Sequence, residues 1–130
     1  MSAVQPMSDA DDHTRDPRDI IWGDAKRAIE RRLTRLDPDL ERYVREFAYG
    51  DIYARGILEP KLQELLAVVM LIALGNPEEL KTHLRGALNN GATELELREV
   101  LIFAIPYLGF PRVIGAFASL KALLEQPSRS

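Results

Sequence analysis

The chain has 130 residues, of which 46% are hydrophobic and 28% are charged, a composition typical of a folded globular domain. Its formal net charge of −3 provides no basic surface for nucleic acid, so no nucleic-acid partner is expected. The sequence has no cysteine and only two histidines, which excludes disulfides and thiolate nucleophiles and predicts that no metal is bound.

The first fifteen residues are rich in Asp, Ser and Thr, and we expect them to form a disordered acidic tail. They lack the basic start and the apolar block of a signal peptide, which predicts a cytoplasmic protein. Residues 16–126 are expected to form a single helical domain, and residues 127–130 a frayed end.

Two Asp-Pro pairs, at 16–17 and 37–38, each predict a helix start. The Asp side chain can cap the exposed amides, and Pro fits the first helical position. After each pair, apolar residues recur at helical spacing, so we expect one amphipathic helix after the first pair and another after the second. Gly50 is expected to end the second helix, and residues 51–59 to form a turn or one loose helical turn.

The chain is organised around residues 60–91, which predict two helices joined by a tight turn at residues 75–77. Every residue from Leu65 to Leu74 is apolar, so the first helix should be enclosed on all sides by its own chain or by another subunit. Ten residues are too few to span a bilayer, and no membrane contact is expected. The short connection makes the two helices antiparallel neighbours.

The last third of the chain predicts two more helices. Thr93 and Glu96 have the spacing of a capping box, Pro106 should kink or end the helix that follows, and Pro111 should begin the last one. No segment alternates with period two for long enough to form a strand, so the fold class is all-α with about six helices around the buried central hairpin. These helices carry more apolar residues than one core-facing stripe per helix would need. The excess predicts a homo-oligomer in which another copy of the chain covers it.

Two side chains of the central hairpin form a candidate acid–base pair. Glu64 lies at the polar end of the apolar helix, and His83 lies nineteen residues later at the edge of the next helix's apolar stripe. Histidine exchanges a proton near neutral pH, and a carboxylate can orient it. Spacing alone leaves an alternative open, in which Glu64 belongs to an exposed first turn and His83 bonds a backbone group.

Two blocks of sequence resemble the carboxymuconolactone decarboxylase family. One is residues 79–101 (ELKTHLRGALNNGATELELREVL), followed by the Tyr, Gly and Pro of residues 107–111. The other is residues 49–55 (YGDIYAR). The resemblance covers about residues 38–125, and it implies the all-helical fold of alkylhydroperoxidase D-like proteins, usually assembled as trimers or hexamers.

The resemblance also implies which chemistry to expect. In the related peroxidases a Glu and a His, spaced as Glu64 and His83 are here, relay protons to a Cys pair at the positions of Asn76 and Glu79. Without cysteine, thiol peroxidase activity is not expected. What the resemblance implies instead is decarboxylation, without a cofactor, of γ-carboxymuconolactone or a related small lactone, a reaction of aromatic catabolism of the protocatechuate and β-ketoadipate type.

Within that reaction, each candidate residue has a hypothetical role. His83 delivers a proton to carbon and Glu64 orients it, while Arg55 and Arg85 receive the carboxylates of a small anionic lactone or keto acid. Tyr107 polarises the lactone oxygen. Arg85 lies on the polar side of its helix, so it reaches a site only at a subunit boundary.

One departure from the family pattern leaves two alternatives open. Decarboxylases of the family commonly carry an acidic residue and several arginines where this chain has residues 59–63 (EPKLQ). Part of the expected positive charge is therefore missing. The substrate is then a different lactone or keto acid, or the protein is a relative without decarboxylase activity. The alternative class is a non-enzymatic or ligand-binding helical oligomer in which Glu64 and His83 are polar interface residues.

Overall fold

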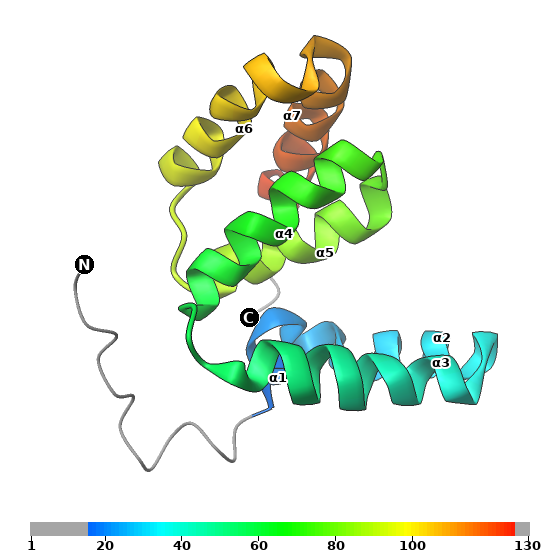
Figure 1. Ribbon diagram of the computed structural model, residues 1–130. Coiled ribbons are helices and arrows are strands. Elements are labelled where there is room, and N and C mark those ends of the chain that lie inside the picture. Colours follow the sequence, from blue (N-terminus) through cyan, green and yellow to red (C-terminus); the bar gives the residue numbers. More distant parts are fainter. Residues whose placement is uncertain (1–15, 127–130) are drawn as a thin grey trace. The chain divides into compact units, whose positions relative to one another are not determined.

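The computed structural model describes residues 16–126 (Figure 1), so the expected tail and frayed end lie outside the described residues. Within 16–126 it contains seven α-helices, several short 3₁₀ and π segments and no strand, which confirms the all-α fold class. The backbone contacts group the chain into two compact units, one up to Pro60 and one from Lys61. No helix in the described part is long and apolar enough to cross a membrane.

The first unit begins at the first Asp-Pro pair. Its elements are α1 (Pro17–Ile21), the 3₁₀ turn η1 (Gly23–Ala25) and α2 (Lys26–Leu36). The Asp16 side chain accepts a hydrogen bond from the Arg18 amide at 2.9 Å, as the capping prediction required. The prediction of one uninterrupted helix is wrong: Gly23 adopts a φ of 51°, a left-handed conformation that interrupts the helical hydrogen bonding.

The second Asp-Pro pair also begins a helix, α3 (Pro38–Tyr43), with Asp37 accepting hydrogen bonds from two amides. The chain then continues as the π-helix η2 (Val44–Ile52) and the 3₁₀ turn η3 (Tyr53–Arg55). The predicted stop at Gly50 is therefore wrong. Helical structure ends instead at Gly56, whose φ of 73° is the left-handed conformation that often terminates a helix.

Aromatic rings and one buried cation hold the first unit together. Tyr49, buried in the π-helix, meets Trp22 edge-on at 5.0 Å between ring centroids and stacks on Tyr53 at 4.5 Å. Arg18 is only 6% exposed and lies over the Trp22 ring. Its guanidinium pairs with Asp16 and also lies near carboxylates of α2 and α3, so α1 is tied electrostatically to both helices.

The second unit contains four helices, α4 (Pro60–Leu74), α5 (Pro77–Asn89), α6 (Glu94–Leu108) and α7 (Phe110–Leu124). As predicted, α4 and α5 form a hairpin and lie side by side (Figure 1). Gly75 turns the chain with a φ of 73°, and the Asn76 side chain accepts the Glu79 amide at 3.2 Å to cap α5. Helix α7 packs against both α5 and α6.

The core of the second unit forms where the inner faces of these helices meet. Its largest fully buried apolar side chains are those of Val68, Leu84, Leu97, Leu101 and Val113. Helix α4, however, leaves Leu66 40%, Met70 60% and Leu74 74% exposed. A single copy of the chain therefore does not enclose this helix, and its enclosure by another subunit stays a prediction.

The junction between α6 and α7 is set by two prolines and a glycine. Helix α6 continues past Pro106 to Leu108, so this proline does not end it. Gly109 then adopts φ 87° and ψ 161°, a region of backbone conformation open essentially to glycine alone. Pro111 lies in the first turn of α7, as predicted.

The predicted capping box begins α6 and also joins it to α4. The Thr93 hydroxyl accepts the Glu96 amide at 3.0 Å, and the Glu96 carboxylate accepts the Thr93 amide at 3.0 Å. The same carboxylate accepts a hydrogen bond from Lys61 Nζ at 3.0 Å. The bond from the Thr93 amide, followed by that from Lys61, holds the pKa of Glu96 below its ordinary value of 4.5.

This lowered pKa predicts an acid-sensitive contribution to stability from Glu96. The contribution is complete above about pH 4.5 and is lost as the pH falls through the lower pKa of the folded state. Glu96→Gln, which retains a capping acceptor, should therefore flatten the fall in stability below pH 4.5 in urea titrations. Equal slopes for wild type and Glu96→Gln would contradict the assignment.

Candidate acid–base site

Glu64 and His83 occupy the inner faces of the α4–α5 hairpin. Glu64 shares its face of α4 with Val68 and Ile72, which follow it at intervals of four residues and are also buried. On α5, His83 is buried next to Leu84. Both polar side chains thus project from rows of residues that pack into the core of the second unit.

The structure brings these two predicted residues together. His83 Nδ1 and Glu64 Oε1 are 2.8 Å apart, a hydrogen-bond distance. Glu64 is 0% exposed, and His83 is 8% exposed. The alternative in which Glu64 lies in an exposed first turn is therefore wrong, and the His83 bond runs to a carboxylate.

The second carboxylate oxygen distinguishes this pair from an ordinary structural hydrogen bond. Glu64 Oε2 is buried and has no hydrogen-bond partner among the residues that the structure describes. A buried acceptor without a partner costs about 1–3 kcal/mol, and more when it is charged. A group kept at such a cost to stability is typical of functional sites.

The bond to Glu64 also determines which ring atom of His83 is available for chemistry. Nδ1 is engaged with the carboxylate, whereas Nε2, on the opposite edge of the imidazole, takes no part in that bond. Nε2 is therefore the atom that can exchange a proton with a bound molecule. Within residues 16–126 there is no group of three or more His, Cys, Asp or Glu side chains suited to holding a metal ion.

The other three candidate residues take no part in this hydrogen bond. Arg85 follows His83 by two positions, about 200° around the helix, so it points away from the pair. Tyr107 is 77% exposed, and its ring lies 5.8 Å from that of Phe103. Arg55 is exposed at the end of η3 in the first unit. Of the four candidates in the second unit, the structure thus brings together only Glu64 and His83.

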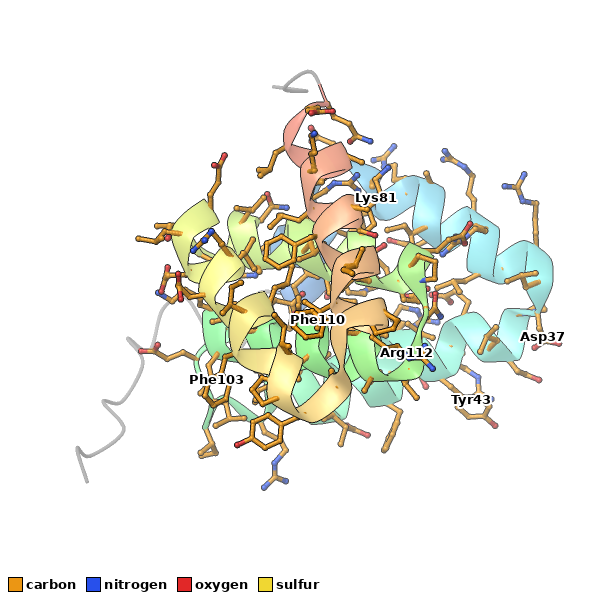
Figure 2. The ribbon with its side chains drawn as sticks, turned by 90° about the horizontal axis from the view of Figure 1, so that it is seen from above. Asp37, Tyr43, Lys81, Phe103, Phe110 and Arg112 are labelled. Atoms are coloured by element: carbon orange, nitrogen blue, oxygen red, sulfur yellow. The ribbon has the colours of Figure 1, made fainter. Side chains whose placement is uncertain are left out.

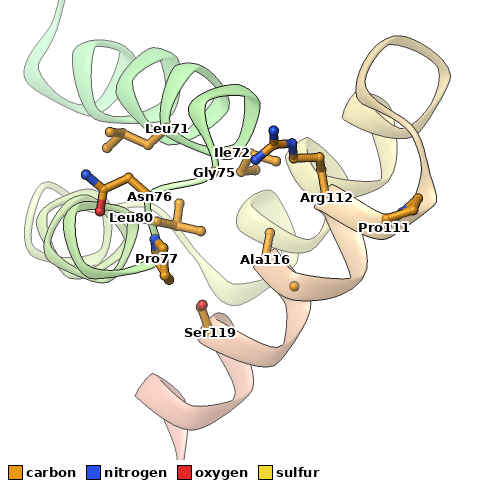
Figure 3. Close-up of a pocket in the computed structure, with 11 residues that line it drawn as sticks. Leu71, Ile72, Gly75, Asn76, Pro77, Leu80, Pro111, Arg112, Ala116 and Ser119 are labelled. Atoms are coloured by element: carbon orange, nitrogen blue, oxygen red, sulfur yellow. The ribbon is translucent and has the colours of Figure 1, made fainter.

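A pocket at the turn between α4 and α5 was not predicted. It has a volume of about 380 Å³, and its lining includes Asn76, Arg112 and Ser119 (Figure 3). Neither Glu64 nor His83 lines it. Its residues come from three helices and share no motif or spacing, so the sequence held no signal that would have grouped them.

The model of the carboxymuconolactone decarboxylase family matches residues 38–122. The chain belongs to this family. The matched stretch begins with α3, crosses from the first unit into the second and includes both Glu64 and His83. The resemblance noted in the sequence is thereby confirmed.

Two relatives are decarboxylases by name. The chain is 34% identical over 79 residues to 4-carboxymuconolactone decarboxylase of Acinetobacter baylyi, an overlap of 61% of this chain and 59% of the relative. It is 33% identical over 99 residues to nitrosuccinic acid decarboxylase of Metarhizium robertsii, an overlap of 76% of this chain and 69% of the relative. The chain thus spans less than two thirds of the Acinetobacter protein.

The unpartnered oxygen of Glu64 leads to a prediction about stability. His83→Leu leaves the carboxylate buried without its partner and should lower the free energy of unfolding by about 3 kcal/mol or more. Glu64→Leu/His83→Leu removes both polar groups and should return stability to within about 1 kcal/mol of wild type. Urea denaturation at one protein concentration measures both. If the double variant were instead as unstable as His83→Leu, the pair would be a net source of stability.

Proposed function

We propose that this protein decarboxylates a small carboxylated lactone, 4-carboxymuconolactone or a related acid, without a cofactor, and that His83 delivers the proton. The observation that carries the proposal is the buried 2.8 Å contact between His83 Nδ1 and Glu64 Oε1. The names of the two relatives support the reaction class, because both are decarboxylases of small organic acids.

The two named substrates have one chemical property in common. Loss of carbon dioxide leaves an electron pair on the carbon that carried the carboxylate. In carboxymuconolactone the conjugated lactone carbonyl accepts that pair, and in nitrosuccinic acid the nitro group does. The substrate therefore supplies its own electron acceptor, and the protein must stabilise the anion and deliver one proton to carbon.

His83 and Glu64 can perform this proton delivery together. In the imidazolium form, Nδ1–H donates to Glu64 and Nε2–H faces the substrate, while the carboxylate compensates the positive charge. After transfer the ring is neutral, and the bond to Glu64 keeps the remaining proton on Nδ1. Nε2 then takes its next proton from solvent, which completes the cycle. Glu64 acts through His83 and is a positioning residue.

The substrate is an anion, so the proposal also needs cationic contacts. Arginine suits this role because its guanidinium fork matches a carboxylate. Arg55 remains a candidate from the first unit. Arg85 points away from His83, and Tyr107 is largely exposed, so these two serve a site only where copies of the chain meet.

We further propose that the protein is a homo-oligomer, a trimer or a hexamer, as its family membership suggests. Large apolar side chains remain exposed along α4 and at the α6–α7 end of the second unit. The most exposed at the α6–α7 end are Phe103 at 70%, Tyr107 at 77%, Phe110 at 64% and Ile114 at 63% (Phe103 and Phe110 are labelled in Figure 2). Clusters of exposed apolar residues usually mark interfaces.

The proton-delivery role is tested with His83→Gln. The glutamine amide can still donate to Glu64 but has no proton to deliver to carbon. We expect turnover of 4-carboxymuconolactone, followed by ultraviolet absorbance, to fall at least 10²-fold, as is typical for the loss of a general acid. Circular dichroism and thermal unfolding should change little. Unchanged turnover in His83→Gln would refute the role.

Assembly is tested with Phe103→Glu, which places a charge in the exposed apolar cluster. Light scattering coupled to size exclusion should show an oligomer for wild type and a smaller species for the variant. Arg98→Glu is the matched control, because it places the same residue at an exposed position of α6 that is already charged. A monomeric wild type, or an oligomer that Phe103→Glu leaves intact, would count against this interface.

A further inference from the structure

The pocket at the α4–α5 turn has the features of a binding site for a small organic acid. It lies between the end of α4, the start of α5 and one face of α7 (Figure 3). Most of the lining is apolar, including Leu71, Ile72, Leu80 and Ala116. Its volume of about 380 Å³ falls within the range of roughly 300–1,000 Å³ that ligand pockets occupy.

Arg112 is the only charged residue among those described that line this pocket. No carboxylate shares the lining with it, so the positive charge is not neutralised from within. A pocket with an apolar body and one guanidinium is complementary to a molecule that carries one carboxylate on an apolar framework.

The guanidinium of Arg112 lies close to Gly75. In Figure 3, Arg112 reaches from α7 to the turn, and a Cβ built on Gly75 would lie 1.6 Å from Arg112 Nη1. Only glycine leaves room for this approach, and the φ of 73° favours glycine as well. The guanidinium therefore lies close to the turn, at one end of the pocket.

The opposite end of the same face of α7 adds a second polar group. Ser119 follows Arg112 by seven residues, two helical turns and about 10 Å along the axis. Its hydroxyl can donate to or accept from a polar substituent of the ligand. Between them lie Gly115 and Ala116, whose small size leaves the middle of the pocket open.

We propose that this pocket binds a small organic monocarboxylate, with its carboxylate on Arg112 and its apolar body against α4 and α5. The site is separate from the acid–base pair. Neither Glu64 nor His83 lines it, and Ile72 is eight residues, about 12 Å along the helix, from Glu64. The inference goes beyond the proposed decarboxylation and does not depend on it.

The probes for this site are benzoate and its neutral analogue benzamide, titrated into the full-length protein by saturation-transfer difference NMR. Wild type should bind benzoate at least tenfold more tightly than benzamide, because a hydrogen bond to a charged group strengthens binding by about that factor. Arg112→Gln should weaken benzoate binding at least tenfold and remove the preference. Lys121→Gln, which removes a charge from the same helix outside this pocket, should leave both affinities unchanged.

A second variant blocks the pocket without removing charge. A Cβ built on Gly115 has nothing within 4 Å, so Gly115→Leu fills open space. It should abolish binding of both probes while leaving the melting temperature unchanged or raised, since leucine favours a helix over glycine. His83→Gln should retain benzoate binding whether or not decarboxylation is lost. Equal affinity for the two probes, full binding by Arg112→Gln or Gly115→Leu, or loss of binding in His83→Gln would each overturn the proposal.

Discussion

The hydrogen bond between Glu64 and His83 is the constraint on which the rest of the second unit depends. The Glu64 carboxylate in this bond has no exposed surface, so α4 and α5 lie close enough together to exclude water from around it. The tight turn at Gly75, the Asn76 cap and the packing of α7 against α5 all serve that approach. The capping box at Thr93, with its contact to Lys61, then joins the start of α6 to the start of α4.

Burial in this molecule is uneven. The acid–base pair is enclosed, whereas Met70 and Leu74, on the same helix as Glu64, are largely exposed. Helix α4 thus combines a closed inner face with an open apolar outer face. Enclosure of this outer face by a second copy of the chain is part of the proposed assembly.

Much of this arrangement could be predicted because its determinants are local. The helix caps at Asp16, Asp37, Asn76 and Thr93 can be recognised from the residues next to each helix start. The run of apolar residues and the turn at residues 75–77 likewise predicted the central hairpin correctly. The errors arose where tertiary packing outweighs local preference: the π-helix continues through Gly50 so that Tyr49 packs against Trp22, a contact between residues far apart in sequence. The pocket around Arg112 escaped prediction for the same reason. Glu64 and His83 are nineteen residues apart in the sequence, and their contact could be predicted only because the two helices of a hairpin lie side by side.

Asn76 has a structural role at the turn between α4 and α5. The sequence resemblance implies a cysteine at this position in the related peroxidases, whereas here the Asn76 side chain accepts the Glu79 amide and caps α5. A good cap stabilises a helix by about 1 kcal/mol, so a position that elsewhere takes part in redox turnover here contributes to folding. The proposed acid–base pair consists of a carboxylate and an imidazole, and the chain has no thiol to oxidise. An oxidant that inactivates an enzyme by converting a catalytic cysteine to a sulfenic acid therefore has no such target in this chain.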